Sequence, residues 1–300
     1  MDSRQIAVPE DSMDLATIKK LLKKEQRDIK LKKFLHNRLA MTGFVIMILV
    51  MILALFAPVL APMGPYDVDV KNRLSAPSLT HLFGTDNYGR DLFARVLYGA
   101  RISLGVGAGA SLIAAIVGVI VGLYAAYYKW MDNLLMRICD GLKAIPSTLL
   151  AIALMAVLGS SMTNVIISLA IVHIPDIARV VRAEAILIKE QTYVEAMKSL
   201  GASSKRIIWS HIAPNVISPV IVQISFIFAT AIISEAALSF LGVGIPVPTP
   251  SWGNILSDGK TYIYNSWWMV VFPGISMALT VLGLNLFGDG IRDVLDPMTN

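Results

Sequence analysis

The chain has 300 residues, of which 55% are hydrophobic and 16% are charged, and its formal net charge is +5. Soluble domains carry about 25% charged residues. The composition therefore excludes an ordinary soluble protein and indicates a polytopic membrane protein. A single cysteine, Cys139, excludes an internal disulfide and a cysteine metal cluster. The positive charge suits either nucleic acid or a membrane surface, and its distribution decides between them.

The first 38 residues form the longest hydrophilic stretch and hold ten lysines and arginines. Apolar residues such as Leu22, Ile29 and Phe34 are interleaved with them, which predicts a basic amphipathic helix on an anionic membrane face. With one aromatic residue and no recognisable binding module, the stretch gives little support to nucleic-acid binding. We expect a cytoplasmic basic tail with a role in membrane association or assembly.

Long uncharged stretches follow the tail, and a helix of about 20 apolar residues crosses a bilayer. Residues 144–175 carry no charge, are too long for one span and too short for two, and contain a turn signal at Gly159. The third span must therefore begin near Asn133, and the fourth must continue to Arg182. The expected spans are residues 39–62, 102–128, 133–158, 163–182, 216–240 and 267–288. They leave two outer loops, residues 63–101 and 242–266.

The distribution of lysine and arginine predicts the orientation. If the amino terminus is inside, the cytoplasmic segments hold 20 of the 26 basic residues and the outer segments hold six. This asymmetry satisfies the positive-inside rule. We expect an all-α protein of six transmembrane helices with both termini in the cytoplasm. The same asymmetry accounts for the basic composition without nucleic acid.

The longest polar interruption in the second half of the chain is residues 193–215, YVEAMKSLGASSKRIIWSHIAPN. Val194, Met197 and Leu200 are spaced as one apolar stripe, which predicts a short helix over residues 193–200. Such a helix spans about 12 Å. That size suits a compact knob that docks into a groove on another protein.

The rest of this loop contains signals for a turn and a second helix. Gly201 stands where a helix ends in a left-handed turn. Ser203 or Ser204 can cap the second helix, and Pro214 ends it before the next apolar stretch. We therefore expect an ordered helical unit between the fourth and fifth spans.

This loop resembles the EAA loop of ABC importer permeases. The resemblance rests on Glu195 and Ala196, Gly201 six residues after Glu195, and Pro214 thirteen residues later, while Met197 replaces an alanine of the family pattern. It implies that residues 190–215 form a coupling helix that fits a cleft on a cytoplasmic ATPase. The ATPase-coupling residues would then be Glu195, Ala196, Met197, Gly201 and Pro214.

Three further regions resemble the peptide and nickel branch of these permeases. They are HLFGTDNYGRDLFARVLYGARISL (81–104), EAALSFLGVG with PTPSWGN (235–254), and LTVLGLNLFGDGIRDVLDP (279–297). The resemblance covers about residues 39–298 and implies the type I importer permease fold in the bacterial cytoplasmic membrane. It also implies three kinds of partner: a paralogous permease, two cytoplasmic ATPases that hold ATP and Mg, and an extracellular or periplasmic binding protein.

The sequence offers no convincing catalytic or metal-binding constellation. The four histidines are scattered over different segments, without metal-ligand spacing. Gly259 and Lys260 resemble the end of a phosphate loop, but five residues separate Gly253 from Gly259 where the motif has four. We therefore expect no enzyme activity and no cofactor in this chain.

Two sets of charged residues in or near the spans have alternative interpretations. Glu235 in the fifth span is either a pathway residue or an interfacial structural carboxylate. Asp86, Arg90 and Asp91, with Arg95 on the same periodicity, form either a self-paired network or, with Arg101, an outer gate or dock for the binding protein. The list of possible gate or dock residues is Asp86, Arg90, Asp91 and Arg101.

The expected function is therefore import of small peptides, driven by an ATPase and coupled through residues 193–215. A nickel or metal-chelate importer is the alternative within the same branch. An ion-coupled secondary transporter is the alternative from another class, but it would carry ionisable groups in the middle of its spans and often internal repeats.

Overall fold

The computed structural model describes Leu21, residues 24–25, residues 28–29 and residues 32–295. Most of the predicted basic tail, residues 1–20 included, lies outside the described residues. Within the described part the fold is all-helical, apart from one isolated β-bridge between Thr85 and Asp91. The elements are α2 (Arg38–Leu55), α3 (Ala57–Leu60), η1 (Val70–Asn72), α4 (Leu92–Tyr127), α5 (Lys129–Lys143), α6 (Ser147–Leu158), α7 (Met162–Lys189), α8 (Thr192–Ser199), α9 (Ser204–Arg206), η2 (Ile207–Ile212), η3 (Ala213–Asn215), α10 (Ile217–Phe240), α11 (Trp252–Lys260) and α12 (Trp268–Leu295).

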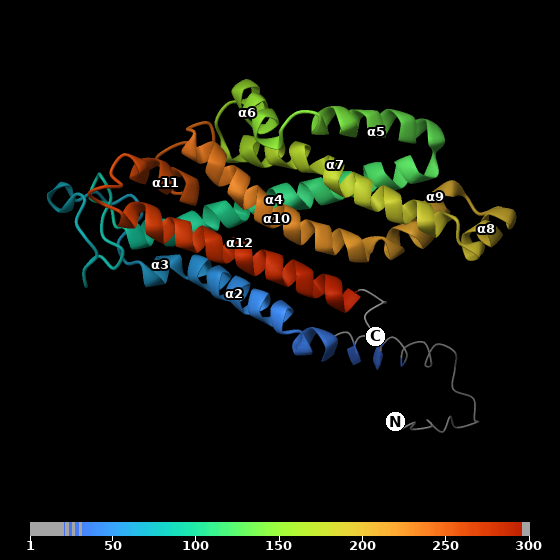
Figure 1. Cartoon of the computed structure of the whole chain (residues 1–300), viewed down its shortest axis with the longest axis horizontal. Helices are drawn as coiled ribbons and strands as arrows, with labels where there is room; N and C mark the ends of the chain where they lie inside the picture. The colour runs from blue at the N-terminus through green and yellow to red at the C-terminus, as the bar shows by residue number, and fades with distance from the viewer. Residues whose placement is uncertain (1–20, 22–23, 26–27, 30–31, 296–300) are drawn as a thin grey trace.

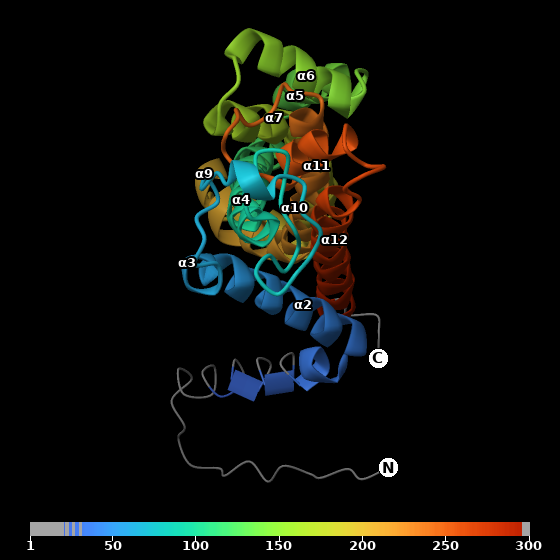
Figure 2. The same cartoon turned by 90° about the vertical axis from the view of Figure 1, so that its left-hand side faces the viewer.

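Five long helices, α2, α4, α7, α10 and α12, run along one axis as a bundle (Figure 1). The loop helices α8 and α9 project from one end, which we call the α8 end. The connection between α3 and α4 lies with α11 at the opposite end, which we call the α11 end. Viewed along the bundle, α5 and α6 lie on one side and α2 on the other, with α4 and α10 between them (Figure 2).

Local sequence signals set the starts of these helices. The side chain of Asn37 accepts hydrogen bonds from two amides in the first turn of α2, Asp91 does the same for the amide of Ala94 in α4, and Ser161 for Asn164 in α7. Each bond satisfies a donor that the first turn of a helix leaves unpaired. The predicted turn at Gly159 is confirmed, since this residue has a φ of +82° between α6 and α7.

The core of the bundle is the contact of α4 with α7. Gly118 and Gly122 allow the two backbones to approach closely, since a Cβ at Gly122 would lie 2.6 Å from the carbonyl oxygen of Ala178. A Cβ at Gly118 would lie 2.7 Å from that of Ile177. Small residues at such positions allow helices in lipid to gain close van der Waals contact. The α2–α12 contact follows the same rule, with Gly290 against Ala40.

The expected third span, residues 133–158, is not one continuous helix. It consists of α5 and α6, which meet at an angle of 94°. Pro146 explains the break, because a proline disfavours helical geometry in the residue before it and cannot donate an amide hydrogen bond. Length and lack of charge suggested a single span, but neither property detects a bend.

The helix that contains the expected second span, residues 102–128, begins ten residues earlier. Helix α4 starts at Leu92 and includes Arg95 and Arg101 within its 36 residues. Restricting spans to uncharged stretches missed this start, because Arg95 is buried among acidic partners rather than exposed to lipid. In the second outer loop, residues 242–266, the structure adds helix α11, which the sequence did not predict.

Five described helices are long and apolar enough to cross a membrane, and the bent pair α5–α6 brings the number to six if it counts as one span. They include the regions expected for the first, second, fourth, fifth and sixth spans.

Candidate functional site

The first candidate site is the loop between α7 and α10, which projects from the α8 end (Figure 1). Its first helix, α8, extends from Thr192 to Ser199, one residue earlier at each end than expected. Glu195 and Ala196 are exposed on it, and Met197 is half-buried. The two residues at the centre of the predicted motif therefore face away from the rest of the chain.

The turn after α8 is set by Gly201. Its φ is +80°, and the amides of Gly201 and Ala202 donate to the carbonyl oxygens of Lys198 and Met197, each at 3.0 Å. This pair of bonds is the Schellman arrangement that ends helices in a left-handed residue. A Cβ at Gly201 would meet no atom within 4 Å. The requirement for glycine at this position is therefore conformational and not steric.

The inner face of the loop is anchored in the bundle core. Val194 is 1% exposed and lies in one apolar cluster with Ile207, Ile208 and Ile212. This cluster also contains residues near the ends of α4 and α7, such as Leu123. The three isoleucines therefore form one buried apolar face of the loop.

The predicted apolar stripe of α8 is only partly directed at the chain itself. Val194 is buried, but Leu200 is 82% exposed and Tyr193 is 44% exposed. The 3.6-residue period placed Val194, Met197 and Leu200 on one side of a helix, but it could not show that the stripe faces two environments. The helix is thus fixed through Val194 and leaves apolar side chains uncovered near both of its ends.

The loop also contacts the end of α4. The Lys189 ammonium donates to the carbonyl oxygens of Ala126 and Tyr127, each at 3.0 Å, which satisfies the open end of that helix. The ammonium groups of Lys189 and Lys198 also lie 5.4 and 6.0 Å from the Tyr127 ring centroid. The Lys198 contact connects α8 to a helix that reaches the α11 end, and the Lys189 contacts connect the last turn of α7 to the same helix.

Pro214, the last predicted coupling residue, is exposed in the short 3₁₀ turn η3. It follows η2, six residues of π-helix from Ile207 to Ile212. Proline has no amide hydrogen, so the regular helical ladder cannot pass through this position. The side-chain amide of Asn215 donates to the His211 carbonyl oxygen at 2.6 Å and bridges the irregular turn.

A second polar region, which the sequence did not single out, lies between α5 and α7. We call it the α5–α7 seam, and it comprises three ion pairs between antiparallel helices. The pairs are Asp132–Arg182 (2.5 Å), Asp140–Arg179 (2.7 Å) and Lys143–Asp176 (2.7 Å). His173 adds a 3.2 Å contact to Asp176. Complementary charges in the two stretches were the available signal, but only the fold shows that these stretches are adjacent.

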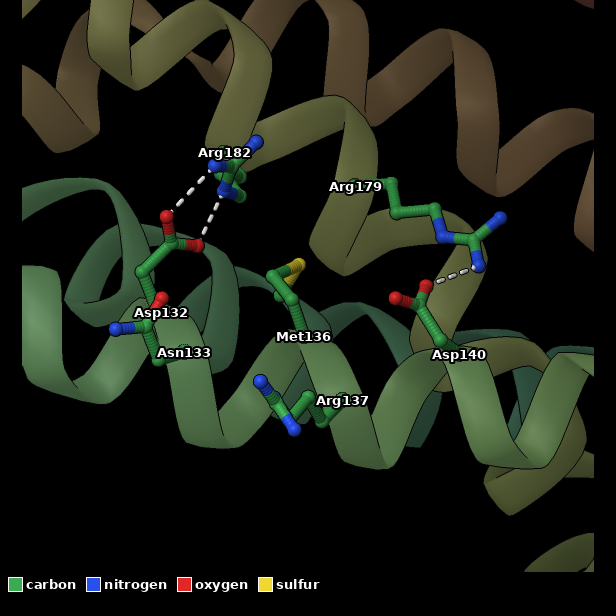
Figure 3. Close-up of a pocket in the computed structure, with 7 residues that line it drawn as sticks. All are labelled: Asp132, Asn133, Met136, Arg137, Asp140, Arg179 and Arg182. Carbon is green, nitrogen blue, oxygen red and sulfur yellow. Dashed lines mark hydrogen bonds and ion pairs between the residues drawn. The ribbon is translucent and has the colours of Figure 1, made fainter.

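The geometry of the seam differs along its length. Arg182 binds Asp132 through two parallel hydrogen bonds, whereas Arg179 reaches Asp140 through one (Figure 3). Between the pairs lies a hollow of about 410 Å³ with Met136 and Arg137 in its wall. Arg137 has no hydrogen bond or ion pair within the described residues, and Figure 3 shows no link from it to its neighbours.

The candidate gate residues at the α11 end are mostly buried and paired. Asp86 contacts Arg90 at 2.6 Å and Arg95 at 3.4 Å, and both arginines approach Asp258 of α11. Burial raises the pKa of Asp258, and the positive charges of Arg95 and Arg90 oppose this shift. We call these four residues the outer cluster. It links the loop before α4 to α11.

Asp91 and Arg101 lie apart from the outer cluster. Asp91 caps α4 and contacts His81 at 2.9 Å. Arg101 is exposed, with its guanidinium 5.7 Å from the Tyr98 ring centroid. Of the four residues proposed as a gate or dock, only Arg101 is presented on the surface of this chain.

Glu235 of α10 is fully buried. Its two carboxylate oxygens accept hydrogen bonds from Ser103 of α4 and Ser239 of α10, each at 2.8 Å. Ser103 in turn accepts the amide of Trp252 at 3.3 Å, at the start of α11. This carboxylate therefore joins α4, α10 and α11. No group of three or more histidine, cysteine or acidic side chains within the described residues could hold a metal ion.

Comparison with known proteins agrees with this arrangement. Residues 118–300 match the family model described as the binding-protein-dependent transport system inner membrane component. Residues 27–77 match the N-terminal TM domain of oligopeptide transport permease C. The inward-facing methionine ABC transporter MetNI has a similar fold, with a TM-score of 0.57 at 17% identity, over 67% of this chain and 97% of that one.

Three relatives show similarity over most of their length, each 46% identical and covering 89% of this chain. They are a putative peptide transport system permease protein of Brucella abortus, the dipeptide transport system permease protein DppC of Alkalihalophilus pseudofirmus and the glutathione transport system permease protein GsiD of Escherichia coli. The matches cover 90%, 88% and 88% of these relatives. Together with the family model, they show that the chain is a multi-pass inner membrane protein that belongs to the family of inner membrane components of binding-protein-dependent transport systems.

Proposed function

We propose that the chain is the permease subunit of an ATP-driven importer of small peptides. Relatives of nearly the same length carry the names of peptide, dipeptide and glutathione transport permeases, and glutathione is itself a small peptide. These names favour peptides over the nickel alternative. Family membership also argues against an ion-coupled secondary transporter.

The observation that carries the coupling part of this proposal is the geometry of the loop after α7. Helix α8 is fixed to the core by Val194, turned by Gly201 and left with Leu200 and Glu195 exposed. A rigid projection with an uncovered apolar side chain fits a docking role better than a simple connection does. We propose that Glu195, Ala196, Met197, Gly201 and Pro214 transmit the movement of an ATPase to the bundle.

The partners of a binding-protein-dependent permease are a substrate-binding protein and an ATPase. We further propose a paralogous permease as the second membrane subunit and two ATPase chains that hold ATP and Mg. In this scheme ATP binds one state of the ATPase pair more tightly, and that difference in affinity switches the bundle between two openings. In this scheme the chain changes conformation and forms part of the passage, and it catalyses no reaction.

The α5–α7 seam is a candidate for the lining of that passage. Ionisable groups at membrane depth face a protein interior or a water-filled cavity, because exposure to lipid is unfavourable. The seam is polar and open at the hollow beside Arg137, and its ion pairs are half-exposed or exposed in this chain. We propose that this face lines the passage together with the second permease.

The proposed orientation places the α8 end and both termini in the cytoplasm, with six spans if α5 and α6 count as one. It predicts that a cysteine at Ser78 in the first outer loop reacts with an impermeant thiol reagent added to intact cells. A cysteine at Ser203, just after α8, should react only in inside-out vesicles. Labelling of the Ser203 variant in intact cells would overturn both the orientation and the coupling role.

The substrate class is tested by uptake. A deletion strain should lose uptake of labelled dipeptides, tripeptides or longer peptides, and the wild-type chain should restore it. Labelled nickel is the control substrate. Restoration of nickel uptake without peptide uptake would favour the nickel alternative. Restoration of neither uptake would refute both the peptide and the nickel assignment.

A further inference from the structure

Helices α2 and α10 both pack on α12, and an apolar groove of about 360 Å³ lies between them. In Figure 1, α12 lies between the other two helices. Its walls are Phe44, Met47, Ile48, Met51, Ile221, Ile224, Ser225, Phe228, Leu284 and Phe287.

The groove can accept only an apolar occupant. Ser225 supplies the one polar side chain in its walls, and that hydroxyl already donates to the carbonyl oxygen of Ile221 at 3.2 Å. From Phe44 to Met51 the α2 wall rises about 10 Å along the helix axis. The site is therefore an apolar slot within the membrane region, open toward the surface of the bundle.

Aromatic rings at one end of the groove, which we call its mouth, pack against the helical turn that precedes α2. The centroid of the Phe34 ring lies 5.9 Å from that of Phe44 and 6.2 Å from that of Phe287, and both of these rings line the groove. Lys32, two residues before Phe34, and Arg38, four residues after it, are exposed. Within the described part of the chain, neither charged group has an ion-pair partner.

The charges at this mouth have a positive excess. Lys32, Lys33 and Arg38 lie within four residues of Phe34, and Arg292 lies in the last turn of α12. Asp289 and Asp293 supply negative charge near the end of α12, and Asp293 accepts a hydrogen bond from the side-chain amide of Asn37 at 3.2 Å. A basic rim above an apolar slot is complementary to an anionic headgroup above an acyl chain.

We propose that this groove binds an anionic phospholipid, with one acyl chain between α2 and α10 and the headgroup at Lys32 and Arg38. The lipid would fill the space that α2 and α10 leave open over α12. It would also hold the turn that contains Phe34 against the bundle. This site is separate from the coupling loop, the α5–α7 seam and the outer cluster.

The experiment is a lipid titration of the purified, delipidated transporter complex, read by native mass spectrometry. Phosphatidylglycerol and phosphatidylcholine with identical acyl chains are the two probes. One phosphatidylglycerol per copy of this chain should bind about 25-fold more tightly than phosphatidylcholine, because each of the two basic residues at the membrane surface strengthens anionic binding roughly fivefold. Equal binding of the two lipids would refute the headgroup assignment.

Matched variants locate the site. Lys32→Gln with Arg38→Gln should abolish the preference for phosphatidylglycerol, whereas Lys205→Gln with Arg206→Gln removes two exposed charges at the same end and should preserve it. Ile221→Trp fills the groove and should weaken both lipids, whereas Ile233→Trp changes an equally exposed isoleucine (46% against 40%) outside the groove on the same helix. Met51→Trp on the opposite wall repeats the test if the first variant fails to assemble.

Two results would overturn the proposal. If the control variants lose as much lipid as the groove variants, the lipid belongs to a non-specific shell. If Ile221→Trp releases another subunit from the complex while lipid binding is unchanged, the occupant of the groove is a protein helix.

Discussion

The outer cluster and the α5–α7 seam are both built from arginine–carboxylate pairs, but their surroundings are opposite. In the outer cluster, Asp86 and Arg95 are each 1% exposed. In the seam, the pair between Asp140 and Arg179 has side chains 66% and 49% exposed. Removing one partner of a buried pair leaves an unpaired charge without water, whereas an exposed pair exchanges protein contacts for water with little change. The same chemistry therefore fixes one region and leaves the other able to rearrange.

The largest effect should come from Arg95→Met in the outer cluster. This change leaves Asp86 and Asp258 with one arginine between them, and breaking a buried pair destabilises a protein by about 3–5 kcal/mol. Arg101→Met, on an exposed residue of the same helix, should change the unfolding free energy by less than about 0.5 kcal/mol. Thermal unfolding of the purified complex in detergent measures both. Similar losses for the two variants would remove the distinction between the regions.

Glu235→Gln should have the next largest effect. The amide keeps the size of the carboxylate, but its NH₂ group cannot accept the hydrogen bond that one of the serines now donates. A buried group left unsatisfied costs about 1–3 kcal/mol. We expect transport to fall more than assembly, because α4, α10 and α11 lose their common link. Transport at the wild-type rate would show that the carboxylate is only a structural group.

Gly201→Val tests whether the α8 end acts through the shape of its loop. A β-branched residue resists a φ of +80° by about 1–2 kcal/mol, so the turn after α8 should change direction. The complex should assemble, but binding protein should no longer stimulate ATP hydrolysis. Gly274→Val is the control, because this glycine also has no neighbour within 4 Å of a Cβ but lies within α12. Glu195→Ala should weaken coupling less, since Leu200 and Val194 remain.

The smallest change in stability should come from the α5–α7 seam. Asp132→Arg should cost about 1 kcal/mol or less, because both side chains of the pair keep access to water (24% and 34% exposed), while it slows peptide uptake through repulsion of Arg182. Adding Arg182→Asp exchanges the two charges and should restore uptake. Unfolding and uptake assays on the single and double variants distinguish loss of the ion pair from the effect of a changed residue at either position. If the double variant remains as slow as the single one, the pair does not act as a unit.

Features set by neighbouring residues could be predicted from the sequence. The left-handed turn at Gly201 and the break at Gly159 depend on a few adjacent positions, and both were predicted. The ion pair of Asp132 with Arg182 could not be, because 50 residues separate the partners and only the packing of α5 on α7 brings them together. The start of α4 was missed for the same reason, since the partners that make Arg95 acceptable within a helix include Asp258.

Pro146, which marks the bend, could have been read from the sequence, but the third span was predicted from the length of the uncharged stretch alone. The predicted apolar stripe of α8 shows a different limit. The period identifies one side of a helix, but the division of that side between the chain and the solvent depends on how Val194 inserts into the core. The coupling role of the exposed residues stays a prediction.

Helix α4 has a mechanical consequence. Its 36 residues extend about 54 Å without a proline, from the cap at Asp91 to the tyrosines beside α8, whereas α7 and α12 each contain an internal proline. A continuous helix of this length can act as a lever, because both of its ends are attached, to the outer cluster through Arg95 and to Lys189 through the carbonyl oxygens of Ala126 and Tyr127. A tilt at one end must therefore displace the other end at the same moment. Movements at the two ends of this chain are therefore coupled through α4.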